Sequence, residues 1–341
     1  MVKIRSYISS NFTQSFLTIF LPFFLIISLV YLVKIAALTA QIKLTFVELL
    51  TLYSYSVPDI IFYTLPLSFI AALTNVLLRL STDNELIALY ALGQRSERIL
   101  RSLLIVSLLF SILLLTISLL AMPMSKQLYK SFKQEKRAEA KLNIIPGKLG
   151  QKFGQYYIYV KEKDDAHNTF KDLVIYNRTN MNEEQFFAAK RGKLKKTKGQ
   201  SSLMLQEGYG YTYTHTNLQQ AKYETLEAFD TQKAQPYKFE DTIAYWMRAG
   251  KEERILHRLL FFLFVSLIPL LSLYAVAAFS MINPRYQANH SFVIIFSTTL
   301  VLYLIASSLE KWGNLPLLVT AVLITFGGGV WLFSKRVARY F

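Results

Sequence analysis

The chain of 341 residues is 53% hydrophobic, has a mean hydropathy of +0.30 and contains no cysteine. This composition is typical of an integral membrane protein rather than of a soluble domain. The lack of cysteine excludes a disulfide framework and thiolate chemistry. A net charge of +16 would favour nucleic-acid binding in a soluble protein. In a membrane protein the charge has to be divided among the loops before it is interpreted, and we expect no nucleic-acid partner.

Six apolar runs are long enough to cross a bilayer, which takes about 20 residues. Three runs precede a long polar segment and three follow it. The runs are residues 16–33, 56–78, 99–122, 256–281, 292–309 and 315–333. We therefore predict an α-helical membrane protein with six transmembrane helices and one inserted outer domain.

Basic residues in the short loops predict the orientation of these six spans. One side would hold Lys3, Arg5, Arg79, Arg95, Arg98, Arg101, Arg285, Lys335, Arg336 and Arg339. The opposite short loops hold little beyond Lys34, Lys43 and Lys311. The positive-inside rule then places both termini in the cytoplasm and the segment after the third span outside, because long segments cross whatever their charge.

The outer segment changes its hydrophobic period. Short stretches rich in aromatic and branched residues alternate with Gly, Asn, Asp and Lys clusters, at residues 155–160, 170–176, 203–205 and 209–213. They predict the strands of a β-sandwich or β-jelly roll of about 100 residues. Helical patterns over residues 124–142 and 241–258 would connect it to the membrane. The predicted division is 1–122 for helices 1–3, 123–254 for the periplasmic domain with its connecting helices, and 255–341 for helices 4–6.

The sequence predicts no catalytic, cofactor or metal site. The four histidines, His167, His215, His257 and His290, lack the pair spacing of a metal site. There is no GxxxxGK[ST] loop, so ATP hydrolysis by the P-loop route would need another chain. The run of Gly327, Gly328 and Gly329 lies in an apolar span, where small residues let helices approach closely.

A charged amphipathic helix is predicted between the second and third spans, in LSTDNELIALYALG at residues 80–93. Thr82 and Glu85 match a capping box, and Gly93 is a typical C-terminal stop. Leu86, Leu89 and Tyr90 form an apolar stripe. Spacing leaves two interpretations open: Glu85 only completes its own cap on a helix at the lipid surface, or the helix fits a groove of a separate ATPase.

The same region resembles the lipopolysaccharide-export permease family LptF/LptG, also called YjgP/YjgQ. The resemblance rests on residues 57–58 (VP), 65–68 (LPLS) and 80–93, and extends to the order of three spans, a β-domain and three spans. Residues 282–285 (INPR) and 302–304 (LYL) are closer to LptF than to LptG. The resemblance implies a periplasmic β-jelly roll, and a coupling helix at 83–92 whose Glu85 meets the ATPase.

The resemblance also implies two groups of site residues. Those for ATPase coupling are Asp83, Glu85, Leu86, Leu89, Tyr90 and Gly93. Those for lipid phosphate binding are Lys34, Lys130, Lys133 and Lys311. Lysine costs about 2.5 to 3.5 kcal/mol at the bilayer centre, so each must reach an interface, a partner or a ligand. Simple snorkelling of these lysines to lipid headgroups is the alternative.

We therefore expect a non-catalytic permease subunit of the inner-membrane ABC transporter that extracts lipopolysaccharide and passes it to a periplasmic bridge. The expected partners are an LptG-like second permease, an LptB-like cytoplasmic ATPase dimer that binds ATP and Mg, and LptC-like and LptA-like bridge proteins. No cofactor is expected in this chain. A membrane sensor or scaffold with a ligand-binding periplasmic β-domain is the competing class, and it would not require an ATPase partner.

Overall fold

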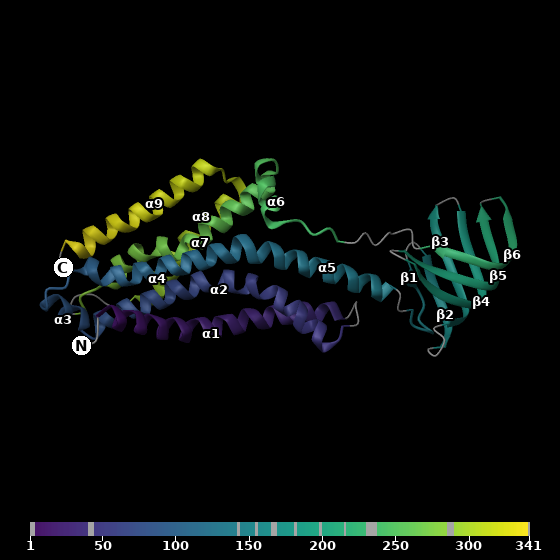
Figure 1. Cartoon of the computed structure of the whole chain (residues 1–341), viewed down its shortest axis with the longest axis horizontal. Helices are drawn as coiled ribbons and strands as arrows, with labels where there is room; N and C mark the ends of the chain where they lie inside the picture. Colours follow the sequence, from purple (N-terminus) through teal and green to yellow (C-terminus); the bar gives the residue numbers. More distant parts are fainter. Residues whose placement is uncertain are drawn as a thin grey trace. The chain divides into compact units, whose positions relative to one another are not determined.

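The computed structural model describes residues 4–39, 44–141, 144–153, 156–164, 169–180, 183–197, 200–214, 216–229, 237–284 and 290–339. Its chain divides into two compact units, and Figure 1 labels their helices and strands. The helical unit comprises Met1–Ala36, Leu49–Leu128 and Phe239–Phe341. The β unit comprises Ala37–Glu48 and Tyr129–Lys238.

Six helices of the described chain are long and apolar enough to cross a membrane, which confirms the six predicted spans by length and composition. They are α1 (Ile4–Thr39), α2 (Phe46–Thr82), α4 (Ser96–Thr116), α7 (Glu253–Ser280), α8 (Ser291–Trp312) and α9 (Leu315–Phe333). The π-helical turn η1 (Ile117–Ala121) joins α4 to α5 (Met122–Lys141), so the third span continues as an amphipathic helix, as predicted. A second π-helical turn, η3 (Ser334–Ala338), follows α9.

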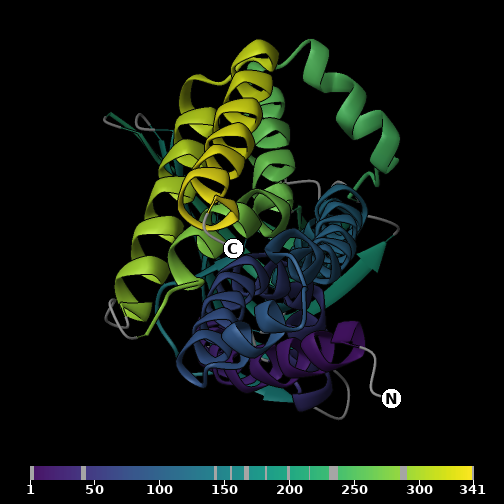
Figure 2. The ribbon, with the colours of Figure 1, turned by 90° about the vertical axis from the view of Figure 1, so that its left-hand side faces the viewer.

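The core of the helical unit lies along α2 and α7. Phe69 of α2 packs against Phe12 of α1, with ring centroids 5.1 Å apart, and Phe62 packs against Phe262 of α7 at the same separation. Several buried hydroxyls, including those of Thr64, Thr74 and Ser266, bond to carbonyls of their own helix, as in the 2.8 Å bond from Thr64 Oγ1 to the Ile60 oxygen. These bonds satisfy polar groups that neither lipid nor core could satisfy. Viewed from one end, α1 lies at one edge of the bundle and α8 and α9 lie at the other (Figure 2).

The predicted helix at 241–258 is wrong in its middle. The chain forms α6 (Thr242–Met247), a 3₁₀ turn η2 (Arg248–Gly250) and then α7, separated by an extended Glu252 with φ −118° and ψ 108°. Gly250 and Lys251 lie at this break, and glycine has a low helix propensity. Trp246 donates its indole N–H to the Leu119 carbonyl over 2.8 Å and so satisfies a carbonyl of the π-helical turn η1.

The β unit contains one six-stranded antiparallel sheet in sequential order. The strands are β1 (Gln151–Phe153), β2 (Tyr156–Asp164), β3 (Thr169–Asn180), β4 (Glu183–Thr197), β5 (Gln200–Thr214) and β6 (Leu218–Phe229). Each described strand pairs with its neighbour in sequence, because short connections favour hairpins. These ladders form a meander, whereas a jelly roll has Greek-key connections between two sheets, so the predicted topology needs this correction.

The apolar interior of the β unit comes from alternate residues of its strands. Ile158 and Val160 of β2, Leu173 and Ile175 of β3, and Leu203 are all almost completely buried. Such alternation gives the sheet one apolar and one polar face. The predicted stretches 203–205 and 209–213 are parts of the single strand β5.

Candidate functional site

The predicted cytoplasmic helix is α3 (Glu85–Ala91), which lies between α2 and α4. The start of α1, the end of α9 and α3 all lie at the same end of the helical unit (Figure 1). We call this the α3 end, and the opposite end the outer end. Of the basic residues used to predict orientation, Lys3, Lys43 and Arg285 lie outside the described residues, as do His167 and His215.

The two ends of α3 differ in how well the sequence predicted them. Thr82 is the last residue of α2 and its hydroxyl donates to the Arg79 carbonyl over 3.2 Å, so the predicted capping box is wrong. A cap requires a residue outside the helical conformation, and here Asn84 takes that place with φ 61°. At the other end Gly93, with φ 75°, donates to the Tyr90 carbonyl over 2.9 Å. Gln94 donates to Leu89 over 3.1 Å, which completes a Schellman motif, and the predicted stop is confirmed.

The apolar stripe of α3 faces the protein. Leu86 is buried in the main core, and Leu89 and Tyr90 are half-buried against it. Burial of Tyr90 raises the pKa of its phenol to about 12. These three side chains therefore fasten α3 to the helical unit.

The opposite face of α3 is accessible. Ile87 is 38% exposed and Leu92 is 74% exposed, and neither was among the predicted coupling residues. Asp83 lies just before this face and pairs with Arg79 over 3.5 Å, with both side chains at least half exposed. A short helix with an apolar and acidic exposed edge thus lies at the α3 end.

Glu85 points from the first turn of α3 to α1. The Tyr7 hydroxyl donates to both carboxylate oxygens of Glu85, at 3.0 Å to Oε1 and 2.9 Å to Oε2. Tyr7 is 41% exposed and Glu85 is half-buried, so this bond lies at the rim of the exposed face.

The predicted phosphate-binding lysines fall in both units. Lys34 on α1 and Lys311 in the last turn of α8 belong to the helical unit, whereas Lys130 and Lys133 on α5 belong to the β unit. The Lys34 ammonium lies over the Tyr31 ring, 5.0 Å from its centroid. Within the part of the chain that the structure describes, no carboxylate lies within 4 Å of any of these four ammonium groups.

A mixed-charge cluster occupies the outer end of the helical unit. Asp59 on α2 pairs with Lys126 on α5 at 3.6 Å, and the side chains are 21% and 39% exposed. Tyr63 of α2 is close enough to Asp59, Tyr31 and Glu310 for electrostatic interaction. Lys34 lies one turn after Tyr31 with its ammonium over that ring, and Lys311 directly follows Glu310 in the last turn of α8.

The comparisons with known proteins agree with this architecture. The model of the family described as lipopolysaccharide export system permease LptF/LptG matches residues 6–335. The chain belongs to the LptF/LptG family. A comparison with curated proteins finds no match.

Membership of the LptF/LptG family implies a multi-pass inner-membrane permease for lipopolysaccharide export that works with other Lpt components in an ABC transporter. The match does not distinguish LptF from LptG. Family members are permease subunits, and the six apolar helices agree with that role.

Three side chains of this LptF/LptG chain were missed by the sequence analysis. Asp59 and Lys126 carried a signal, because a carboxylate inside an apolar run is costly and calls for a partner. Tyr7 carried none, since it lies 78 residues from Glu85 in the sequence. Long-range pairs of this kind have no local pattern.

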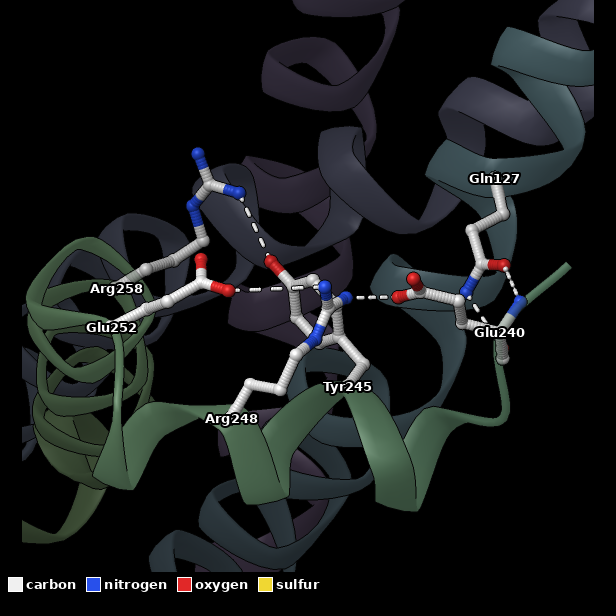
Figure 3. A network of polar contacts seen from close by, with 6 residues as sticks. All are labelled: Gln127, Glu240, Tyr245, Arg248, Glu252 and Arg258. Atoms are coloured by element: carbon white, nitrogen blue, oxygen red, sulfur yellow. Dashed lines mark hydrogen bonds and ion pairs between the residues drawn. The ribbon is translucent and has the colours of Figure 1, made fainter. Parts of the chain in front are cut away.

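Polar contacts also fasten α6 to its neighbours (Figure 3). Gln127 of α5 accepts from the backbone N–H of Glu240 over 2.8 Å and donates to its carbonyl over 3.1 Å. Arg248 pairs with Glu240 and Glu252, and Arg258 of α7 donates to the Tyr245 hydroxyl over 3.2 Å. This network holds the returning chain against α5 and α7 at the outer end.

Proposed function

We propose that this chain is an LptF-type permease subunit that couples ATP hydrolysis on a separate cytoplasmic ATPase dimer to extraction of lipopolysaccharide. The observation that carries the proposal is α3, a short helix whose Leu86, Leu89 and Tyr90 are anchored in the core while its other face is accessible. A helix fastened in this way would pass a displacement on to α2 and α4 instead of bending.

The proposed ATPase contact is the exposed rim of α3. Asp83 and Glu85 would supply negative charge, and Ile87 and Leu92 would supply apolar area. Among the residues first assigned to coupling, Leu86, Leu89, Tyr90 and Gly93 would hold the helix in place instead of touching the ATPase. ATP and Mg would be bound by the ATPase, which we take to be LptB-like.

The proposed orientation places the α3 end in the cytoplasm and the β unit in the periplasm. Support comes from the arginines at the α3 end, including Arg79, Arg95 and Arg98, because short cytoplasmic loops are enriched in basic residues. Both termini would then be cytoplasmic.

The proposed substrate contacts are the four predicted lysines. Lys34 and Lys311 in the helical unit and, separately, Lys130 and Lys133 in the β unit would attract lipid A phosphates, since lysine binds phosphate as a compact point charge. The substrate would enter sideways from the outer leaflet between spans one and five of two permeases, the second being LptG-like. The apolar interior of the β unit would receive acyl chains before transfer to LptC-like and LptA-like bridge proteins.

The proposal is tested by replacing Glu85 with Arg in the tagged full chain. Complexes would be extracted from native membranes in mild detergent, identified by mass spectrometry and assayed for lipopolysaccharide transport. We expect Glu85→Arg to leave the second permease bound, to remove most of the ATPase and to lower transport at least about tenfold, as loss of a buried charged contact does at other interfaces.

Glu97→Arg is the matched control, because Glu97 is an exposed acid at the same end but lies on α4. This variant should keep the ATPase. If Glu85→Arg retains both transport and the ATPase, the coupling role of α3 is wrong. If the wild-type chain emerges without an ATPase from an extraction that preserves known complexes, the sensor interpretation takes precedence.

A further inference from the structure

The start of α1 is hydrogen-bonded to two elements, α3 and the beginning of α4. Tyr7 bonds both oxygens of Glu85 on α3. Two residues after Tyr7, the Ser9 hydroxyl lies 3.0 Å from the Ser102 hydroxyl, and Ser102 of α4 also donates to the Arg5 carbonyl over 3.3 Å. A displacement of α3 or α4 would therefore pull directly on α1.

The next turns of α1 form a firm pivot. Phe12 is 1% exposed and packs against Phe69 of α2 and Phe110 of α4, and the Phe16 ring centroid lies 4.9 Å from that of Phe110. Closely packed aromatic side chains resist deformation, so this part of α1 would move as a rigid body.

The remaining surroundings leave α1 room to move. A groove of about 290 Å³ lies between α1 and α2, and its lining includes Asn11, Gln14 and Asn75. Farther along, Leu25 and Leu29 of α1 are more than 60% exposed, so the outer half makes few contacts inside this chain. Tilting about the aromatic pivot would change the outer half of α1 while disturbing little of the core.

We propose that Tyr7 is a positioning residue that fixes the Glu85 carboxylate for the ATPase and carries the displacement of α3 into α1. The inference rests on the proposed function, because it assumes that Glu85 is driven by an ATPase. Through this bond a displacement of α3 would reach α1 directly, in addition to reaching α2 through the peptide chain. A hydroxyl bonded to a carboxylate suits this role, since hydrogen bonds to charged groups are short and strong.

The test is a double-mutant cycle of Tyr7→Phe, Glu85→Gln and the double variant in the reconstituted transporter. Tyr7→Phe removes only the hydroxyl and keeps the ring, so the fold and assembly should be retained. We expect lipopolysaccharide transported per ATP hydrolysed to fall between about three- and tenfold in Tyr7→Phe, the range that one hydrogen bond represents. The two single effects should be less than additive in the double variant, because both act on the same bond: Tyr7→Phe deletes its donor, and Glu85→Gln removes the charge that strengthens it.

Tyr53→Phe is the matched control. Tyr53 of α2 forms a hydroxyl bond with Ser28 of α1, but it lies roughly 40 Å from Glu85 along the helix axis at 1.5 Å per residue. Its effect on transport per ATP should add to that of Glu85→Gln, as expected for distant sites.

Two results would overturn the inference. One is a Tyr7→Phe transporter that keeps its transport per ATP, and the other is additivity between Tyr7→Phe and Glu85→Gln. If Glu85→Arg abolishes coupling while either result is obtained, only the role of Tyr7 is wrong. If Glu85→Arg keeps the ATPase and transport, the proposed function itself is wrong and the inference fails with it.

Discussion

The central helices of the helical unit and the helices at its edges bury very different shares of their surface. In the most apolar window of α2, 78% of residues are buried, and the share for α7 is 67%. The corresponding shares are 11% for α1 and 6% for α9. All four helices have the length and hydropathy of membrane spans, so hydropathy alone does not separate a scaffold from a surface.

The two groups also differ in their chemistry. The central helices carry fully buried hydroxyls, such as Thr64 and Thr74 of α2 and Ser266 of α7, which bond within their own helices. The edge helices expose large apolar side chains, including Leu25 on α1 and Ile324 on α9. Exposed apolar area is stable in lipid, so the edge helices are the ones whose surfaces are available to lipid.

The largest effect is expected from Phe69→Ala in the central scaffold. Phe69 is completely buried and contacts Phe12 and Phe110, so truncation leaves a cavity that its rigid neighbours cannot fill. We expect a loss of about 3 to 5 kcal/mol of unfolding free energy, measured by thermal and denaturant unfolding in detergent. Leu25→Ala, at 64% exposure on α1, is the matched truncation and should change stability by less than about 0.5 kcal/mol. Equal losses in both variants would contradict the division into scaffold and edge.

Much of the helical unit could be predicted from sequence, because each span is a continuous apolar run. The helix ends could not. The apolar run at residues 16–33 marks hydrocarbon thickness, but α1 extends from Ile4 to Thr39 because polar residues continue a helix beyond the lipid. In the β unit the long strands β4 and β6 were missed, since lysines and glutamines interrupt their alternation and their pairing is decided by neighbouring strands.

The candidate site divides in the same way. The apolar stripe of Leu86, Leu89 and Tyr90 and the stop at Gly93 are local patterns, and the structure has both. Thr82 matched a capping box by spacing, but α2 continues through it. The bond between Tyr7 and Glu85 depends on how α1 packs beside α3, which no local pattern records.

A smaller effect is expected from replacing Gly329 of α9 with a larger residue. Of Gly327, Gly328 and Gly329, it is the one that faces α7. A Cβ added at Gly329 would lie 3.2 Å from the backbone nitrogen of Ala275 on α7, whereas one added at Gly327 has no atom within 4 Å among the described residues. Gly329→Leu should push α9 away from α7 and cost about 1 to 3 kcal/mol, while Gly327→Leu should be tolerated. Unfolding in detergent measures both. If the Gly327 variant is the less stable one, α9 meets its principal neighbour through another face.

The smallest effect is expected at the outer end of the central scaffold, where Asp59 of α2 pairs with Lys126. Both side chains are partly exposed, so screening and the cost of desolvating the two charges offset most of their attraction at 3.6 Å. In a cycle of Asp59→Asn, Lys126→Gln and the double variant, we expect a coupling of about 1 kcal/mol in unfolding free energy. The charge-exchanged variant, Asp59→Lys with Lys126→Asp, should recover part of the loss. Purely additive single effects would mean that the pair contributes nothing to holding α5 on α2, and that the scaffold at this end depends on apolar packing and on the α6 network alone.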